Sequence, residues 1–109
     1  MALKADFVAA LLSCCPRVYP TSQSPNQPVY DLILYEQVQD KPIVFADNKV
    51  AVKQVVFWVY FYGTKSLDSL EKAVDDALPD YFSKLVKEQN FGTVLSKIKE
   101  YTKIEESDV

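Results

Sequence analysis

The segment Val50–Tyr62 constrains the fold of this chain more than any other feature, because apolar side chains alternate along both of its faces. One face carries Val50, Val52, Gln54, Val56, Trp58, Tyr60 and Tyr62, and the opposite face carries Ala51, Lys53, Val55, Phe57, Val59 and Phe61. Side chains of a β-strand alternate between two faces, and β-branched and aromatic residues favour strands. The segment therefore predicts a long central strand, and we expect helices to cover the face that carries Phe57.

A second strand is predicted over Val29–Val38, which is also rich in β-branched and aromatic residues. One of its faces would carry Tyr30, Leu32 and Leu34, and the other Ile33 and Tyr35. Gln39–Pro42 and Asp47–Lys49 favour turns on either side of the short apolar piece Ile43–Phe45. Upstream, Pro16–Pro28 holds four of the six prolines and predicts a long loop.

Two helices are predicted around these strands from their apolar spacing and their boundaries. The first would bury a stripe made of Leu3, Phe7, Ala10 and Leu11. Pro16 would close this helix, because proline cannot continue a helical hydrogen-bond ladder. The second would begin after Ser66 as its N-cap and end at Leu78, before Pro79.

The chain after Pro79 is also predicted to be helical. Asp80–Glu88 would form one piece, and Thr93 would cap a last helix whose inward side chains are Val94, Leu95, Ile98 and Tyr101. The acidic tail Thr102–Val109 would fray. We therefore expect a single domain over residues 1–109 of the α+β class. It would be an antiparallel sheet with helices packed on one face, in the order N-terminal helix, strands, C-terminal helices.

The residues that most catalytic and cofactor sites need are missing from the sequence. It has no histidine, its net charge is −3, and its two glycines, Gly63 and Gly92, lack the spacing of a phosphate-binding loop. Cys14 and Cys15 are adjacent, which favours reduced, buried side chains over a bridge between distant segments. The apolar run Val55–Tyr62 is far shorter than the roughly 20 residues that cross a bilayer as a helix. We expect a soluble protein that is not an enzyme and has no catalytic, cofactor-binding or metal-binding residues.

The apolar surface of the strands exceeds what the expected helices could cover. The residues predicted to remain uncovered are Tyr30, Tyr35, Val56, Trp58, Tyr60 and Tyr62. Such a patch marks a contact between proteins. Base stacking is the alternative, but single-strand binders surround their aromatics with basic residues, whereas Val55–Tyr62 is uncharged and Arg17 is the single arginine. We therefore predict that these six residues form an interface between copies of the chain.

Several short motifs resemble those of one known group of structural proteins. These are the N-terminal helix leading into Arg17–Pro20, the Pro28–Tyr30 entry to a first strand, the long strand Val52–Tyr62, and the helix Ser66–Leu78 with its Asp-Ala-Leu end. Together they resemble the tail-terminator and tail-to-head joining proteins of long-tailed bacteriophages, over residues 3–78, about two thirds of the chain. The chain departs from the pattern after Pro79, where many members return to the sheet with a further strand and this sequence is predicted to be helical.

The resemblance implies a structural virion protein without catalytic residues. Members of the family form hexameric rings that cap the tail tube and meet the head connector. The implied partners are further copies of this chain, the major tail tube protein and the head-completion or connector protein, while DNA passes through the lumen without specific binding. The implied location is the virion neck, after synthesis in the bacterial cytoplasm. A small adaptor domain that acts as a monomer or dimer remains the alternative, and a hydrolase that uses carboxylates is a more distant one.

Overall fold

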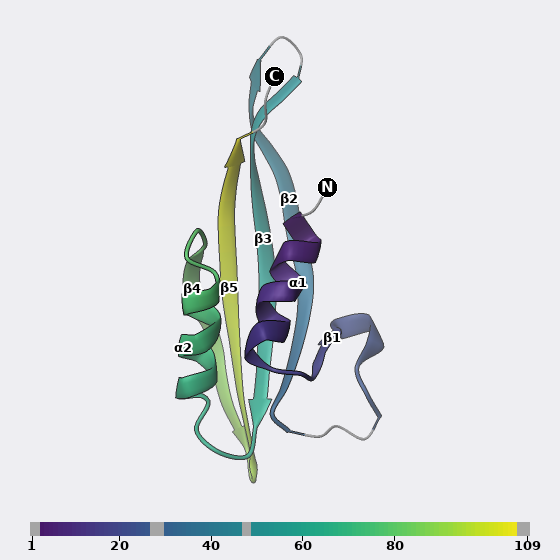
Figure 1. Cartoon of the computed structure of the whole chain (residues 1–109), viewed down its shortest axis with the longest axis vertical. Coiled ribbons are helices and arrows are strands. Elements are labelled where there is room, and N and C mark those ends of the chain that lie inside the picture. The colour runs from purple at the N-terminus through teal and green to yellow at the C-terminus, as the bar shows by residue number, and fades with distance from the viewer. Residues whose placement is uncertain (1–2, 27–29, 47–48, 107–109) are drawn as a thin grey trace.

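The fold is a five-stranded mixed sheet with helices on one face (Figure 1). The computed structural model describes residues 3–26, 30–46 and 49–106. Its elements in chain order are α1 (Leu3–Cys14), β1 (Val18–Pro20), the 3-10 turn η1 (Thr21–Gln23), β2 (Leu32–Ala46), β3 (Lys49–Gly63), α2 (Asp68–Ala77), β4 (Phe82–Phe91) and β5 (Val94–Glu106).

The strands are arranged in the order β1-β2-β3-β5-β4. Every neighbouring pair is antiparallel except β1 and β2, which run parallel over three residues. The β2–β3 hairpin extends well beyond the helices, and this gives the molecule its elongated shape of 54 × 23 × 20 Å (Figure 1).

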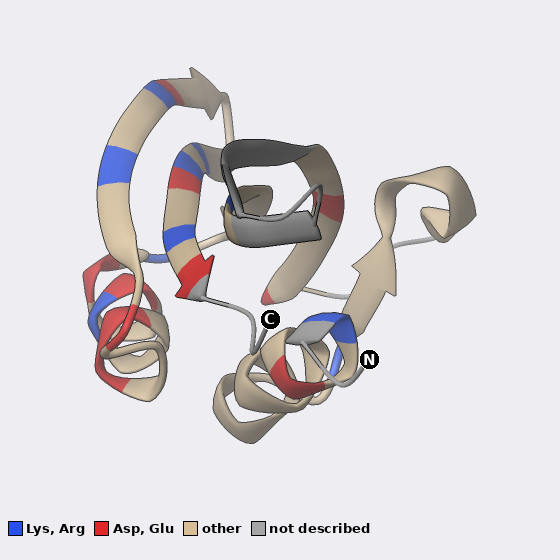
Figure 2. Ribbon diagram, turned by 90° about the horizontal axis from the view of Figure 1, so that it is seen from above, with Lys and Arg blue, Asp and Glu red and all other residues tan. Residues whose placement is uncertain are grey.

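Both helices lie on the same side of the curved sheet, which divides it into a covered face and an open face (Figure 2). The core sits between the helices and the covered face. Phe7 of α1 stacks on Phe57 of β3 with ring centroids 4.0 Å apart. Leu11 of α1 and Val74 of α2 are also fully buried there.

The prediction for the central strand is confirmed, as is that of the N-terminal helix. The helix predicted to end at Leu78 is also present and ends one residue earlier, at Ala77. Four of the six side chains that the alternation assigned to the Phe57 face are fully buried under the helices, namely Val55, Phe57, Val59 and Phe61. The second helix begins at Asp68, one residue later than expected, and the Ser66 hydroxyl accepts a hydrogen bond from the Asp68 backbone N–H at 3.3 Å.

The predicted C-terminal helices are wrong, and so is the fold class that placed helices there. Residues 82–91 and 94–106 are the strands β4 and β5. Gly92, at φ +75°, lies in the two-residue turn that joins them, and a positive φ at this place suits the tight turns of hairpins. The chain therefore does return to the sheet after Pro79. The tail does not begin to fray at Thr102, because β5 continues to Glu106; residues 107–109 lie outside the described part.

Two expectations for the first half of the chain are also wrong. The loop predicted over 16–28 contains β1 and η1. The turn predicted over Gln39–Pro42 is instead part of β2, which absorbs the irregular sequence by register shifts between Gln37 and Gln39 and between Pro42 and Val44. Pro42 lies in the part of β2 beyond its pairing with β1. Proline is tolerated where one side of a strand has no partner, because the missing N–H can face away from the neighbouring strand. Of the second predicted turn, residues 47 and 48 lie outside the described part.

Candidate assembly surface

The structure places the six predicted interface residues on two different faces. Val56, Trp58, Tyr60 and Tyr62 of β3 lie on the open face, opposite the side of Phe57. Tyr35 is paired with Val59 and packs against the core on the covered face, so it does not belong to the same surface. Tyr30 precedes β2 and lines a shallow hollow of about 150 Å³ together with Tyr62.

Not all of the open face is available for a partner. Leu32, Leu34 and Val56 lie on this face, but only 3%, 8% and 4% of their surfaces are exposed. Trp58, Tyr60 and Tyr62 are half-buried. The structure therefore brings four of the six predicted residues together as a candidate contact: Tyr30, Trp58, Tyr60 and Tyr62.

The polar atoms of two of these aromatics are held by carboxylates on the neighbouring strands. Trp58 Nε1 donates to Glu100 Oε2 at 3.0 Å, and the Tyr60 hydroxyl donates to Glu36 Oε1 at 2.7 Å. Burial, followed by the hydrogen bond to Glu36, raises the pKa of Tyr60 to about 12, so its hydroxyl stays a proton donor. The two rings lie 6.4 Å apart and are fixed in place before any partner arrives.

The sequence-based prediction missed the most exposed part of this surface, which is the outer strand β4. All ten of its residues are exposed, and they include the large apolar side chains Phe82, Leu85, Val86 and Phe91, at 74%, 47%, 40% and 58%. Phe82 and Phe91 are paired with Thr102 and Val94 on the open side of β5. The signal for this hairpin is the Asn90–Gly92 segment, which lies between the two pieces predicted to be helical.

A second group of polar side chains lies on the covered face, between β5 and α2. Lys97 Nζ contacts Glu71 Oε1 at 2.8 Å, and Lys99 Nζ lies 3.0 Å from Glu71 Oε2 and 2.9 Å from Asp75 Oδ2. The Tyr101 hydroxyl donates to Asp75 Oδ1 at 2.7 Å. Every group in this cluster has a partner within it, so the cluster serves to attach α2 to the sheet.

The electrostatics of the cluster agree with this structural role. The hydrogen bond to Glu71 is the main cause that raises the pKa of Lys97. Burial disfavours the ionised form of Glu71, but hydrogen bonds from Lys97 and Lys99 outweigh it and lower the pKa of this carboxyl. Burial and then the hydrogen bond to Asp75 raise the pKa of Tyr101. Each shift favours the protonation state that keeps the ion pairs intact.

We expect Glu71→Gln to lower the free energy of unfolding at neutral pH by about 1–3 kcal/mol, because it removes the negative charge between two lysines and replaces one of the two acceptor oxygens with an NH2 donor. The pKa of Glu71 is lower in the folded chain than its ordinary value of 4.5. Its contribution is therefore complete above that value and is lost as the pH falls through the lower folded pKa. Urea denaturation across this acidic range should give a flatter stability profile for Glu71→Gln than for the parent. If the stability of Glu71→Gln depended on pH as steeply as that of the parent, ionised Glu71 would not be a source of this pH dependence.

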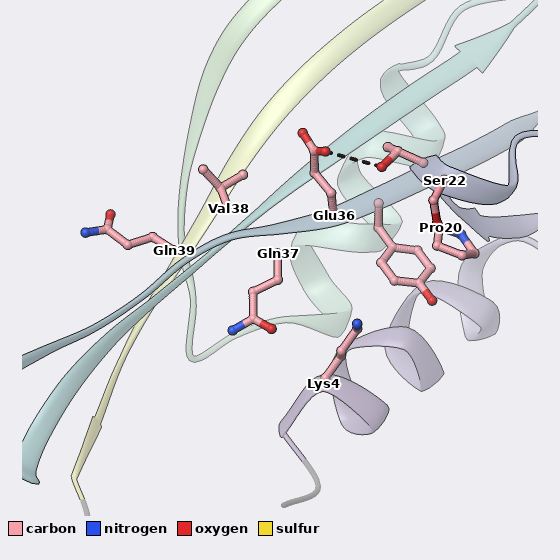
Figure 3. A pocket seen from close by; sticks show the side chains of 9 residues that line it. Lys4, Pro20, Ser22, Glu36, Gln37, Val38 and Gln39 are labelled. Carbon is pink, nitrogen blue, oxygen red and sulfur yellow. Dashed lines mark hydrogen bonds between the residues drawn. The ribbon is translucent and has the colours of Figure 1, made fainter.

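A groove runs along the outer side of β2 (Figure 3). It has a volume of about 540 Å³, and it is lined by Lys4, Pro20, Thr21, Ser22 and Tyr35–Gln39. It begins where β1 ends at Pro20 and the chain turns into η1. Thr21 donates a hydrogen bond to Glu36 Oε2 at 3.2 Å across the start of the groove. The groove leaves the outer edge of β2 accessible at Glu36–Gln39.

No family model matches this chain, and no curated protein matches it at a significant level. Within the described residues, no group of three or more potential metal ligands comes together. In the same part of the chain, neither α1 nor α2 is long and apolar enough to cross a membrane.

Proposed function

We propose that this protein is a structural component of a phage virion that caps the tail tube and joins the tail to the head connector as a ring, with six copies as the expected number. The observation that carries the proposal is the sheet itself. Its covered face is filled by two helices, while the opposite face presents ordered, half-buried aromatics and continues into the exposed strand β4. A surface of this kind is suited to permanent contact with other subunits.

Two further features support the proposal. The motifs at the N-terminal helix, the long strand and the second helix lie in α1, β3 and α2, and the return of β4 and β5 to the sheet removes the departure expected after Pro79. Of the Pro28–Tyr30 motif, residues 28 and 29 lie outside the described part. The net charge of −3 also suits a channel through which DNA slides, because a strongly basic lining would retain it. The proposed partners are therefore further copies, the tail tube protein and the connector protein, with DNA passing through unbound, in the neck of a virion made in the bacterial cytoplasm.

The proposal is tested by removing the gene from a producing phage genome and imaging the particles. We expect heads and tails that remain unjoined, with tails of irregular length, and we expect the intact gene supplied in trans to restore infectious particles. Normal particles from the deletion, or arrest before tails form, would refute a role in tail completion.

The alternative is a small adaptor domain, for which the acidic outer side of α2 would be the contact surface (Figure 2). Asp68 and Asp76 on this helix are 81% and 66% exposed. This alternative would be favoured if reversing the charges on α2 abolished partner binding while substitutions on the open face of the sheet had no effect. The proposal of a ring-forming protein predicts the opposite.

A further inference from the structure

Within the part of the chain that the structure describes, both outer edges of the sheet are unpaired over long stretches. At one edge, β4 pairs with β5 on its inner side, and all ten of its residues are exposed. At the other edge, β1 pairs with β2 only from Ile33 to Tyr35. Among the described residues, the rest of β2, Glu36–Ala46, therefore has no strand on its outer side. Such edges present backbone N–H and C=O groups to any strand of matching length and direction.

We propose that β4 of one copy pairs with the Glu36–Ala46 segment of β2 in the next copy, so that successive subunits share one continuous sheet. The inference rests on the proposed function only in taking a second copy of this chain as the partner. It specifies the contact that closes the ring, which the resemblance does not.

The strand directions favour this head-to-tail pairing. Between β2 and β4 the strands alternate in direction through β3 and β5, so β4 runs opposite to β2. When two copies stand side by side in the same orientation, β4 of one meets β2 of the other in the antiparallel sense. The ten residues of β4 closely match the length of the free segment.

The lysines of β4 disfavour a competing two-fold contact between two β4 strands. Lys84 and Lys87 pair with Glu100 and Ile98, which places both lysines on the open face. A two-fold contact would bring these lysines beside their own copies, and facing like charges destabilise a strand pair.

The groove beside β2 provides space for the incoming strand. It is lined by Pro20–Ser22 on one side and by Tyr35–Gln39 on the other, so it lies at the start of the free segment (Figure 3). Val38 within it is 48% exposed. A strand bound in this groove would cover the Val38 side chain. It would pair with β2 beyond the point where the pairing with β1 ends.

The register of the sheet also determines how the copies must be offset. Lys84, Glu100, Trp58 and Glu36 form one row across the strands. From this row, most of β4 extends toward the end of the sheet that contains Gly63. The free segment of β2 extends in the opposite direction, toward the tip of the β2–β3 hairpin. Neighbouring copies must therefore be staggered along the strands, and a closed ring requires strands tilted to its axis, as in barrels.

Cysteine cross-linking between two singly labelled variants tests this contact. Lys87→Cys and Gln39→Cys would each be made in a chain with Cys14→Ser and Cys15→Ala, mixed at millimolar concentration, and treated with a short bismaleimide. We expect most of the monomer band to be lost to a dimer in the mixture, but not with either variant alone. Lys72→Cys, on the exposed side of α2, is the matched control and should give no dimer with Gln39→Cys.

Each other outcome overturns the edge pairing. A dimer from Lys87→Cys alone indicates the two-fold β4 contact, and a mixture that gives no more dimer than the Lys72→Cys control indicates that the edges do not meet. Amide hydrogen exchange of the unsubstituted protein gives an independent measurement, because β4 amides should become protected as concentration rises.

Particle imaging of the deletion phage reports separately on the proposed function. Cross-linking between β4 and β2 in a protein that has no role in tail completion would refute the proposed function and support the proposed contact.

Discussion

Phe57→Ala is expected to lower the free energy of unfolding by about 3–5 kcal/mol. The ring is fully buried on the covered face and stacks on Phe7 at 4.0 Å. It also lies 6.3 Å from the ring of Tyr81, so aromatics from two other segments depend on it. Because α1 is attached to the sheet through this contact, the cavity cannot close without moving the helix. Urea denaturation followed by circular dichroism measures the loss.

Ile104→Ala is a suitable control for this substitution, because Ile104 lies on the open face of β5 and 45% of its surface is exposed. We expect a loss of about 1 kcal/mol or less for the control. A Phe57→Ala variant as stable as the control would show that the helices do not cover this side of β3.

The parts of the fold that could be predicted from the sequence are those whose local pattern agrees with their packing. In β3, the alternation of Val55, Phe57 and Val59 matches the side that the helices cover. Pro16 and Pro79 bound the two helices, since proline acts through its own backbone whatever packs around it. These signals are local, so the sequence suffices.

The C-terminal hairpin could not be predicted because its decisive interactions are tertiary. Lys97 and Lys99 point into the covered face, where they interrupt the apolar side of the strand. Their position is stable only because Glu71 and Asp75 of α2 meet them there. Val94, Leu95, Ile98 and Tyr101 also share a helical spacing, so the pattern alone favoured a helix.

The dependence on tertiary contacts also limited the prediction of the candidate assembly surface. The alternation of β3 correctly indicated that Trp58, Tyr60 and Tyr62 share a face away from Phe57. It could not indicate that Glu36 and Glu100 would bind two of these aromatics, because the carboxylates come from other strands. Nor could it identify the exposed β4 edge, which exists only once residues 82–91 form a strand.

Replacing both Trp58 and Tyr60 with serine is expected to abolish ring assembly and tail completion while the subunit stays folded. Both side chains are half-buried on the open face, outside the core that α1 and α2 cover. Large aromatics at the centre of an interface dominate its binding energy, so their loss affects assembly most. The variant should be at least as soluble as the parent, because it exposes less apolar surface.

The matched control is Lys72→Ser with Asp76→Ser, which removes an exposed ion pair of 2.8 Å on α2 and should leave assembly intact. Circular dichroism reports the fold, and complementation of the deletion phage reports tail completion. If the Trp58 and Tyr60 variant unfolds, these aromatics belong to the core and the open face is not a contact surface. If it folds and still completes tails, the sheet edges carry assembly without this face. If it still cross-links through β4 and β2 but fails to complete tails, the open face contacts the tube or the connector, and the edges join the ring.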